Sequence, residues 1–221
     1  MPATLSPGVF EFLNALILNN NREWFTENKH LYVESQQNVV AFLEDLIKEM
    51  SGFDEDLAKL DAKKSLFRIY RDTRFSKDKI PYKSNFGASL GMGKGSQKGG
   101  YYLHLELGKS FIAGGIYMPE ASVLRELRKE ISLYAEDFLA VINNKEFKKY
   151  FPELDQEGKL KKIPQGFEKD DPMAEYLKLK NFIVVYNLKD EEISDKNAVK
   201  NLTGIFKLMK PLNDFLNAPL S

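Results

Sequence analysis

"YYLHLELGKSFIAGGIY" (residues 101–117) contains two strand candidates separated by a short polar turn. In the first half apolar and polar residues alternate, which is typical of a β-strand with one face in the core. The residues expected to face the core are Tyr101, Leu103, Leu105 and Leu107, with Tyr102, His104 and Glu106 on the opposite face. Gly108-Lys109 predicts a tight hairpin turn, after which residues 111–117 form the second strand.

The neighbouring segments extend this hairpin into a larger sheet. Residues 67–72 and 85–92 are two further strand candidates upstream of it. The connections between the four candidates are too short for helical crossovers, so we expect an antiparallel meander of about four strands. "NFIVVYNL" (residues 181–188) is rich in β-forming residues and predicts one late strand that rejoins the sheet.

Helical patterns flank the predicted strands on both sides. Ser6-Pro7 is a helix-start signal, and "NNNREWF" (residues 19–25) indicates a helix end, a turn and a new helix start. Apolar periodicity predicts helices at residues 29–50, 120–143, 145–150, 172–178 and 195–217. Pro211 is expected to kink or interrupt the last helix. Helices, then strands, then helices predict an α+β fold with a central antiparallel sheet, and we expect one domain over residues 1–221.

The composition excludes several classes of protein. The chain has 221 residues and no cysteine, which rules out disulfides, thiolate nucleophiles and Cys-based zinc sites. It has 32 basic and 32 acidic residues, and this neutral balance argues against wholesale nucleic-acid binding. No apolar run reaches the roughly 20 residues that span a bilayer, and the N-terminus lacks signal-peptide features. We therefore expect a soluble cytoplasmic protein without a membrane partner.

Positive charge is concentrated in "LFRIYRDTRFSKDKIPYK" (residues 66–83), which has six basic and two acidic residues. Arginine presents a planar fork that binds carboxylate or phosphate with two hydrogen bonds. The segment predicts a site for a phosphorylated or otherwise anionic small molecule, or for a short nucleic acid. The predicted ligand-binding residues are Arg68, Arg71, Arg74, Lys79, Tyr82, Lys83 and Tyr101. The competing interpretation is a solvated sheet face covered by Arg–Asp pairs.

Two further functions are compatible with the same residues. The first is a metal-assisted hydrolase or nuclease, with catalytic candidates Asp72, Asp78, His104 and Glu106. This hypothesis requires the carboxylates to converge on one point. The second is a protein-interaction module whose basic face docks an acidic protein.

"GMGKGSQKGG" (residues 91–100) invites comparison with phosphate-binding loops. It matches neither G-x-x-x-x-G-K-[ST] nor G-x-G-x-x-G, and neither motif's strand-then-helix context is present. We interpret it as a mobile hairpin loop, so it gives no cofactor assignment.

Five motifs occur in order along the chain: "NREWF" (21–25), "FRIYRDTRFSKDKIPYK" (67–83), "GGYYLHLE" (99–106), "GGIYMP" (114–119) and "KIPQGFEKDDP" (162–172). On these motifs the chain resembles a widespread microbial family of conserved proteins known only as a domain of unknown function. The resemblance covers nearly the whole chain. It implies a single α+β domain and brings no activity, cofactor or catalytic residue with it.

Overall fold

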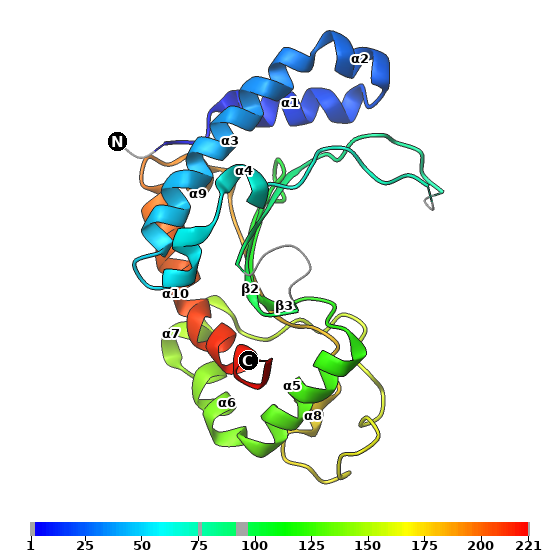
Figure 1. Ribbon diagram of the computed structural model, residues 1–221, viewed down its shortest axis with the longest axis vertical. Helices are drawn as coiled ribbons and strands as arrows, with labels where there is room; N and C mark the ends of the chain where they lie inside the picture. Colours follow the sequence, from blue (N-terminus) through cyan, green and yellow to red (C-terminus); the bar gives the residue numbers. More distant parts are fainter. Residues whose placement is uncertain (1–2, 75–76, 92–96, 221) are drawn as a thin grey trace. The chain divides into compact units, whose positions relative to one another are not determined.

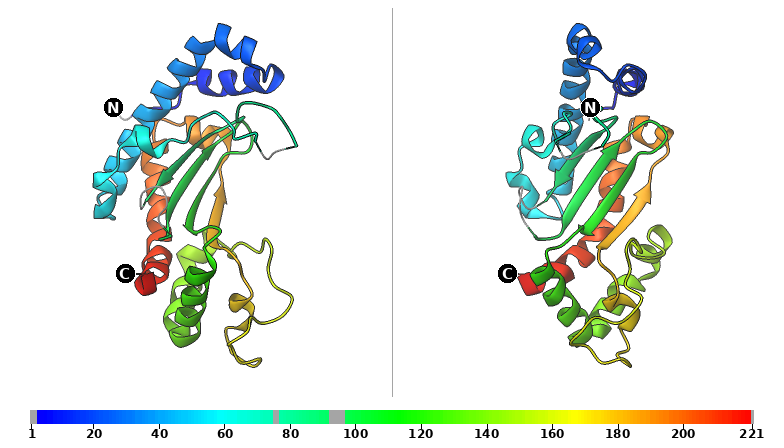
Figure 2. Two further views of the ribbon diagram at one scale, coloured as in Figure 1. Left: turned by 45° about the vertical axis from the view of Figure 1, so that its right-hand side comes forward. Right: turned by 90° about the vertical axis from the view of Figure 1, so that its right-hand side faces the viewer.

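The structure, a computed structural model, describes residues 3–74, 77–91 and 97–220 (Figure 1). Within these residues it contains ten α-helices and one four-stranded antiparallel sheet, which confirms the predicted α+β class. The strands are hydrogen-bonded in the order β1 (Phe86–Leu90), β2 (Gly100–Leu105), β3 (Phe111–Ile116) and β4 (Phe182–Asn187). Figure 2 shows them side by side, with the late strand β4 next to β3 as its β-rich sequence predicts. The middle of the glycine-rich segment predicted as a mobile loop, residues 92–96, lies outside the described residues.

The prediction of a fifth strand at residues 67–72 is wrong. In the described residues near this segment, only isolated antiparallel bridges form, namely Leu66 to Ala88 and Tyr70 to Tyr82. Ile69 is 1% exposed, but Phe67 and Tyr70 are 43% and 48% exposed. The segment therefore lacks the continuous apolar face that keeps a strand in a sheet. It runs outward and pairs with its own return as a projection that we call the basic arm (residues 66–85), drawn in teal in Figure 1.

The strand β2 follows the predicted alternation, with one exception. Tyr101, Leu103 and Leu105 are 3%, 1% and 1% exposed and face the core. Leu107, which the alternation also assigns to the core, is 44% exposed because the chain has already left the strand for the turn. Gly108 occupies this turn with a φ of 69°, a left-handed conformation that glycine adopts without strain.

The chain forms two compact units. The expectation of a single domain over residues 1–221 stays a prediction. Unit 1 consists of residues 1–90, 102–112 and 187–204, and unit 2 of residues 91–101, 113–186 and 205–221. Residues of both units belong to the four strands.

Unit 1 contains the helices of the N-terminal part and one late helix. They are α1 (Pro7–Leu18), α2 (Arg22–Glu27), α3 (Lys29–Met50), the 3-10 helix η1 (Glu55–Lys59), α4 (Ala62–Ser65) and α9 (Asp190–Ser194). α1 begins as predicted, because the side chain of Ser6 accepts a hydrogen bond from the N–H of Gly8 and Pro7 follows it. The long helix α3 matches its predicted bounds and packs against α1.

Unit 2 contains α5 (Ala121–Leu133), α6 (Ala135–Ile142), α7 (Lys145–Tyr150), α8 (Ala174–Leu177) and the 3-10 helix η2 (Ala218–Leu220). The single helix predicted at residues 120–143 is wrong, since the backbone leaves helical geometry at Tyr134 (φ −114°, ψ 47°). The break lets α6 bury Phe138 in unit 2, with ring centroids 5.2 Å from Tyr176 and 5.3 Å from Phe215.

The last helix, α10 (Ala198–Asn217), begins in unit 1 and ends in unit 2. Pro211 lies inside it without interrupting it, so of the predicted kink or interruption the interruption does not occur and the kink stays a prediction. Among the helices of the described residues, none is both long enough and apolar enough to cross a membrane.

Candidate functional site

Asn20 and Phe25 attach the basic arm to the helices of unit 1. The Asn20 side chain donates to the carbonyl oxygen of Tyr82 at 3.1 Å and accepts from its N–H at 3.1 Å. The Phe25 ring stacks on the Tyr82 ring with centroids 4.0 Å apart. The arm is therefore anchored at its base by paired backbone groups and by aromatic packing.

Both tyrosines that we predicted as ligand-binding residues are buried, and their role in ligand binding stays a prediction. Tyr82 is 5% exposed because its ring packs on Phe25. Tyr101 is 3% exposed and lies on the core face of β2, with its ring centroid 5.5 Å from that of Phe206. Each ring therefore packs against a phenylalanine of its own unit.

Two arginines of the basic arm form ion pairs with the two aspartates of the same segment. Arg74 Nη2 lies 2.6 Å from Asp72 Oδ2, and Arg71 Nη1 lies 2.8 Å from Asp78 Oδ2. The hydrogen bond from the arginine holds the pKa of each aspartate below its usual range. Both carboxylates are thus already engaged. These exposed pairs match the interpretation of a solvated Arg–Asp face, and solvent-exposed pairs of this kind contribute little to stability.

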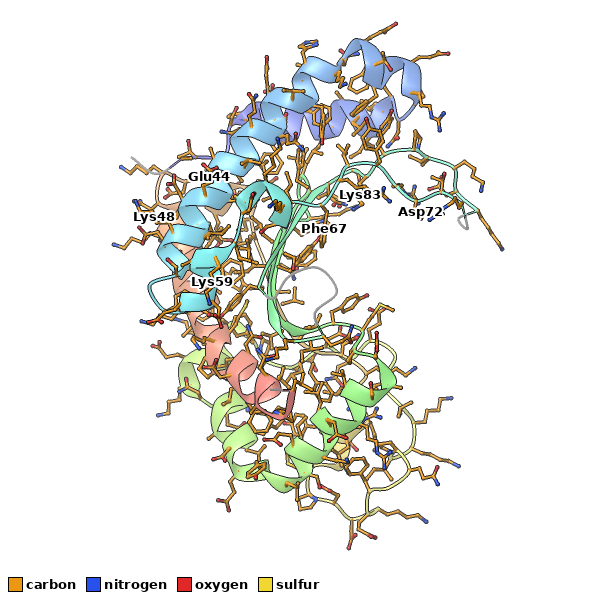
Figure 3. The ribbon with its side chains drawn as sticks, in the orientation of Figure 1. Glu44, Lys48, Lys59, Phe67, Asp72 and Lys83 are labelled. Carbon is orange, nitrogen blue, oxygen red and sulfur yellow. The ribbon has the colours of Figure 1, made fainter. Side chains whose placement is uncertain are left out.

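The four catalytic candidates do not form a metal site in the structure. Figure 3 shows Asp72 toward the outer part of the basic arm, beyond Phe67 and Lys83. Over residues 3–74, 77–91 and 97–220 no group of three or more His, Asp or Glu side chains is placed to hold a metal ion. The convergence that metal-assisted chemistry requires is therefore not found in this part of the chain. Lys79 is also engaged locally, donating to the carbonyl oxygen of Thr73 at 2.9 Å.

Arg68 and Lys83 differ from the other predicted anion donors. Neither forms an ion pair or a side-chain hydrogen bond with any residue that the structure describes. Arg68 is exposed, whereas Lys83 is half-buried with its Nζ 5.3 Å from the centroid of the Phe67 ring. Burial and, second, the positive charge of Arg68 lower the pKa of Lys83. The two cations therefore repel each other, although the charge of Arg68 also helps to lower the pKa of Asp72.

The outward face of β2 carries a line of hydrogen-bonded side chains. Tyr102 Oη lies 3.1 Å from His104 Nδ1, and His104 Nε2 lies 3.1 Å from Glu106 Oε2. The side chains of His104 and Glu106 are 14% and 18% exposed. Burial raises the pKa of Tyr102. We call Tyr102, His104 and Glu106 the β2 relay.

Neighbouring residues of unit 1 hold the β2 relay in position. The Phe111 ring stacks on His104, with centroids 4.6 Å apart and an interplanar angle of 13°. Ser84 Oγ donates to Glu106 Oε1 at 3.4 Å, and Lys109 Nζ lies 3.8 Å from the same oxygen. The backbone N–H of Glu106 donates to Ser110 Oγ at 3.1 Å. Strand β3, the turn before it and the basic arm therefore all support the relay.

Phe67 connects the unpaired cations to the β2 relay. Its ring centroid lies 6.1 Å from that of Tyr102, and Lys83 Nζ lies over the same Phe67 ring. Figure 3 shows Phe67 and Lys83 near the base of the arm. The candidate site consists of Arg68, Lys83, Phe67 and the β2 relay, all in unit 1.

Two hollows lie elsewhere in the described part of the molecule. One, of about 240 Å³, is lined in unit 2 by residues around Phe147 and Phe151, and its Lys159 and Glu175 form an ion pair at 3.1 Å. The other, of about 390 Å³, lies along α1 and α3. We place the site at the base of the arm because uncompensated charge and a hydrogen-bonded histidine occur there together.

Sequence reasoning found part of this site and missed part of it. Alternation placed Tyr102 on the face of His104 and Glu106, but Tyr102 was not predicted as a site residue. Tyr102 could have been predicted as a site residue, because it lies two residues from His104 on the same face of a half-exposed strand. Phe67 and Ser84 lie on the basic arm, and only tertiary pairing brings them to β2, so nothing in their local sequence indicates a role.

A comparison with family models gives one match, to the conserved hypothetical protein family DUF2461, over residues 8–215. No curated protein and no solved structure matches the chain. The matched segment includes the basic arm, all four strands and nearly all of α10. The chain therefore belongs to the DUF2461 family of conserved hypothetical proteins.

Proposed function

We propose that this protein binds a phosphorylated or otherwise anionic ligand at Arg68 and Lys83. One observation carries the proposal: the two cations lie close enough for Arg68 to lower the pKa of Lys83, and no described carboxylate pairs with either. This site is smaller than the one predicted from sequence. Arg71 and Arg74 are already neutralised by Asp78 and Asp72.

An anion at this point would relieve an unfavourable interaction as well as create favourable ones. Two like charges that are partly removed from water repel each other more strongly than they do in bulk solvent. A phosphate between them accepts hydrogen bonds from the Arg68 guanidinium fork and the Lys83 ammonium group. The Phe67 ring, 43% exposed, provides a flat apolar surface beside them for a sugar or a base.

These contacts favour a cytoplasmic phosphorylated small molecule or the end of a short single-stranded nucleic acid. Two cations and one aromatic ring are enough for one phosphoryl group and its substituent. They are too few for a long duplex, which is held by many phosphate contacts.

Isothermal titration calorimetry with inorganic pyrophosphate tests the proposal. We expect the wild-type chain to bind, and both Arg68→Ala and Lys83→Ala to weaken binding by roughly tenfold or more, because a charge-assisted hydrogen bond contributes about 1.5–3 kcal/mol. Lys77→Ala is the matched control, since it removes the same charge from the same arm at an exposed residue. Equal affinity in all four proteins would contradict the proposal, as would absence of binding to the wild type.

A further inference from the structure

The β2 relay has a defined hydrogen-bond direction. A carboxylate can only accept, so Glu106 Oε2 accepts from His104 Nε2–H. In the neutral imidazole the other nitrogen is then an acceptor, so His104 Nδ1 accepts the proton of the Tyr102 hydroxyl. The chain of donors runs from Tyr102 through His104 to Glu106. A proton leaving Tyr102 therefore has a base to receive it, and that base has a carboxylate to stabilise its charged form.

The arrangement places a hydroxyl, a base and an orienting carboxylate in sequence, as in a catalytic triad. Two observations indicate that the fold fixes the positions of His104 and Tyr102. Phe111 stacks on the His104 ring and fixes its plane. A Cβ at position 87 would overlap the Tyr102 hydroxyl, so Gly87 on β1 provides the space in which that hydroxyl lies.

The relay borders the proposed anion site. The Phe67 ring centroid lies 6.1 Å from the Tyr102 ring centroid and 5.3 Å from Lys83 Nζ. Phe67 is therefore a neighbour both of the β2 relay and of a cation of the proposed anion site.

We propose that Tyr102, with His104 and Glu106 behind it, is the general base for hydrolysis of a phosphate monoester bound at Arg68 and Lys83. The inference rests on the proposed function. Tyr102 touches the attacking water and is the catalytic residue, whereas His104 and Glu106 act through it as positioning residues.

The step balances without any further reactant than water. The water oxygen forms a bond to phosphorus as the bond between phosphorus and the ester oxygen breaks. The water proton passes to Tyr102 Oη while the Tyr102 proton passes to His104 Nδ1, and Glu106 stabilises the imidazolium. The imidazolium then returns its proton through Tyr102 to the departing ester oxygen or to solvent. The products are inorganic phosphate and an alcohol.

Burial of Tyr102 supports the relay over direct attack by its oxygen. Because burial raises the pKa of the phenol, the hydroxyl stays protonated, and a proton moves through it only when His104 accepts one. Arg68 and Lys83 stabilise the charge that develops on the phosphoryl oxygens.

Steady-state hydrolysis of p-nitrophenyl phosphate tests the inference. We expect turnover by the wild-type chain, and a loss in kcat of roughly a hundredfold or more in Tyr102→Phe, within the usual range for a general base. Pyrophosphate affinity should be unchanged in this variant. Lys77→Ala should keep the wild-type kcat, and the loss in Tyr102→Phe purified in the same way excludes a contaminating phosphatase. Circular dichroism checks that Tyr102→Phe is folded.

The positioning residues have a separate readout. Glu106 lies at His104 Nε2 with Lys109 beside that carboxylate, and the Tyr102 hydroxyl lies at His104 Nδ1. Glu106→Gln keeps the size of the side chain but removes the carboxylate that stabilises the imidazolium, so kcat should fall while pyrophosphate affinity is unchanged. Glu106→Asp should restore part of the lost kcat. If Glu106 acted only through packing, Glu106→Gln would keep the wild-type kcat.

The outcomes separate the two proposals. Turnover that Tyr102→Phe leaves intact overturns the relay. Pyrophosphate binding without any p-nitrophenyl phosphate hydrolysis also overturns the relay and leaves the anion site standing. Absence of both binding and hydrolysis overturns the two together.

Discussion

Gly87 and Lys83 show how one residue can set the chemistry of the candidate site. Gly87 lies on β1 and has no side chain, and this lets the Tyr102 hydroxyl approach the neighbouring backbone and reach His104. Lys83 lies at the base of the basic arm with Arg68 as its charged neighbour. Neither feature is visible from residue type alone, since a glycine or a lysine in a strand-rich segment is common.

Gly87→Ala should lower the free energy of unfolding by about 1–3 kcal/mol, the usual cost of adding a group to a packed site. The added methyl group displaces the Tyr102 ring and breaks its hydrogen bond to His104. Gly204→Ala in α10 is the matched control, because the space that an added methyl group would occupy there is open and alanine favours a helix by up to about 1 kcal/mol. Urea unfolding measures both. A Gly87→Ala protein as stable as wild type would show that Tyr102 is not confined there.

The affinity for sulfate should fall at alkaline pH because of Lys83. Burial and the nearby Arg68 lower the pKa of Lys83, so its charge is present at neutral pH and is lost at a lower pH than that of an ordinary lysine. Sulfate keeps its charge throughout, so the loss belongs to the protein. We expect the affinity to be lower at about pH 10 than at about pH 7, because Lys83 contributes to binding only while it is protonated. Lys83→Arg should abolish the decrease and Lys77→Arg should not. Calorimetry at the two pH values checks this, and a loss that persists in Lys83→Arg assigns the titration to another group.

Three consecutive asparagines show how an element boundary is specified. Asn19 ends α1 and its side chain donates to the carbonyl of Ala15. Asn21 begins α2 by accepting from the N–H of Trp24 at 2.9 Å. Asn20, between them, pairs with both backbone groups of Tyr82. The two caps follow from the sequence pattern, but the third role requires a partner 62 residues away.

Asn20→Ala should lower the free energy of unfolding by about 1–3 kcal/mol, because it leaves the N–H and C=O of Tyr82 without these partners in a partly buried position. Asn14→Ala serves as the control, since Asn14 is exposed on α1 and its replacement should change stability by less than about 0.5 kcal/mol. Thermal and urea unfolding of the two variants give the comparison. Equal stabilities would show that the basic arm is not anchored through Asn20.

For the whole molecule, net charge and local charge pairing lead to different expectations. The chain is neutral, and "LFRIYRDTRFSKDKIPYK" carries six basic residues. Within it Arg71 and Arg74 are paired with aspartates, and Lys79 donates to a carbonyl. The ion pairs therefore lower the effective charge of the arm, whose remaining cations are Arg68, Lys77, Lys79 and Lys83.

Binding of a short oligothymidylate should accordingly depend only weakly on salt. Two phosphate contacts to a single strand predict a slope of about −1.4 in a plot of log K against log salt concentration. Engagement of all six basic residues would give a slope near −4. Fluorescence anisotropy over a range of sodium chloride concentrations measures the slope. Arg68→Ala should make the slope shallower by about 0.7. A slope near −4 would contradict the small-anion site and favour a nucleic-acid groove.

The sequence by itself determined the α+β class, three strands of the meander, the late strand, and the bounds of helices such as α3 and α7. These features depend on local periodicity and on caps, which act over a few residues. Tertiary structure alone decided that residues 66–85 leave the sheet as an arm, that Tyr82 and Tyr101 are buried, and that Phe67 reaches Tyr102. It also decided which basic residues of the arm form ion pairs with a carboxylate. Burial depends on contacts between residues that are distant along the chain, and ion pairing depends on the path that the arm takes. The sequence of residues 66–83 therefore shows a local excess of positive charge without showing which of its basic residues form ion pairs.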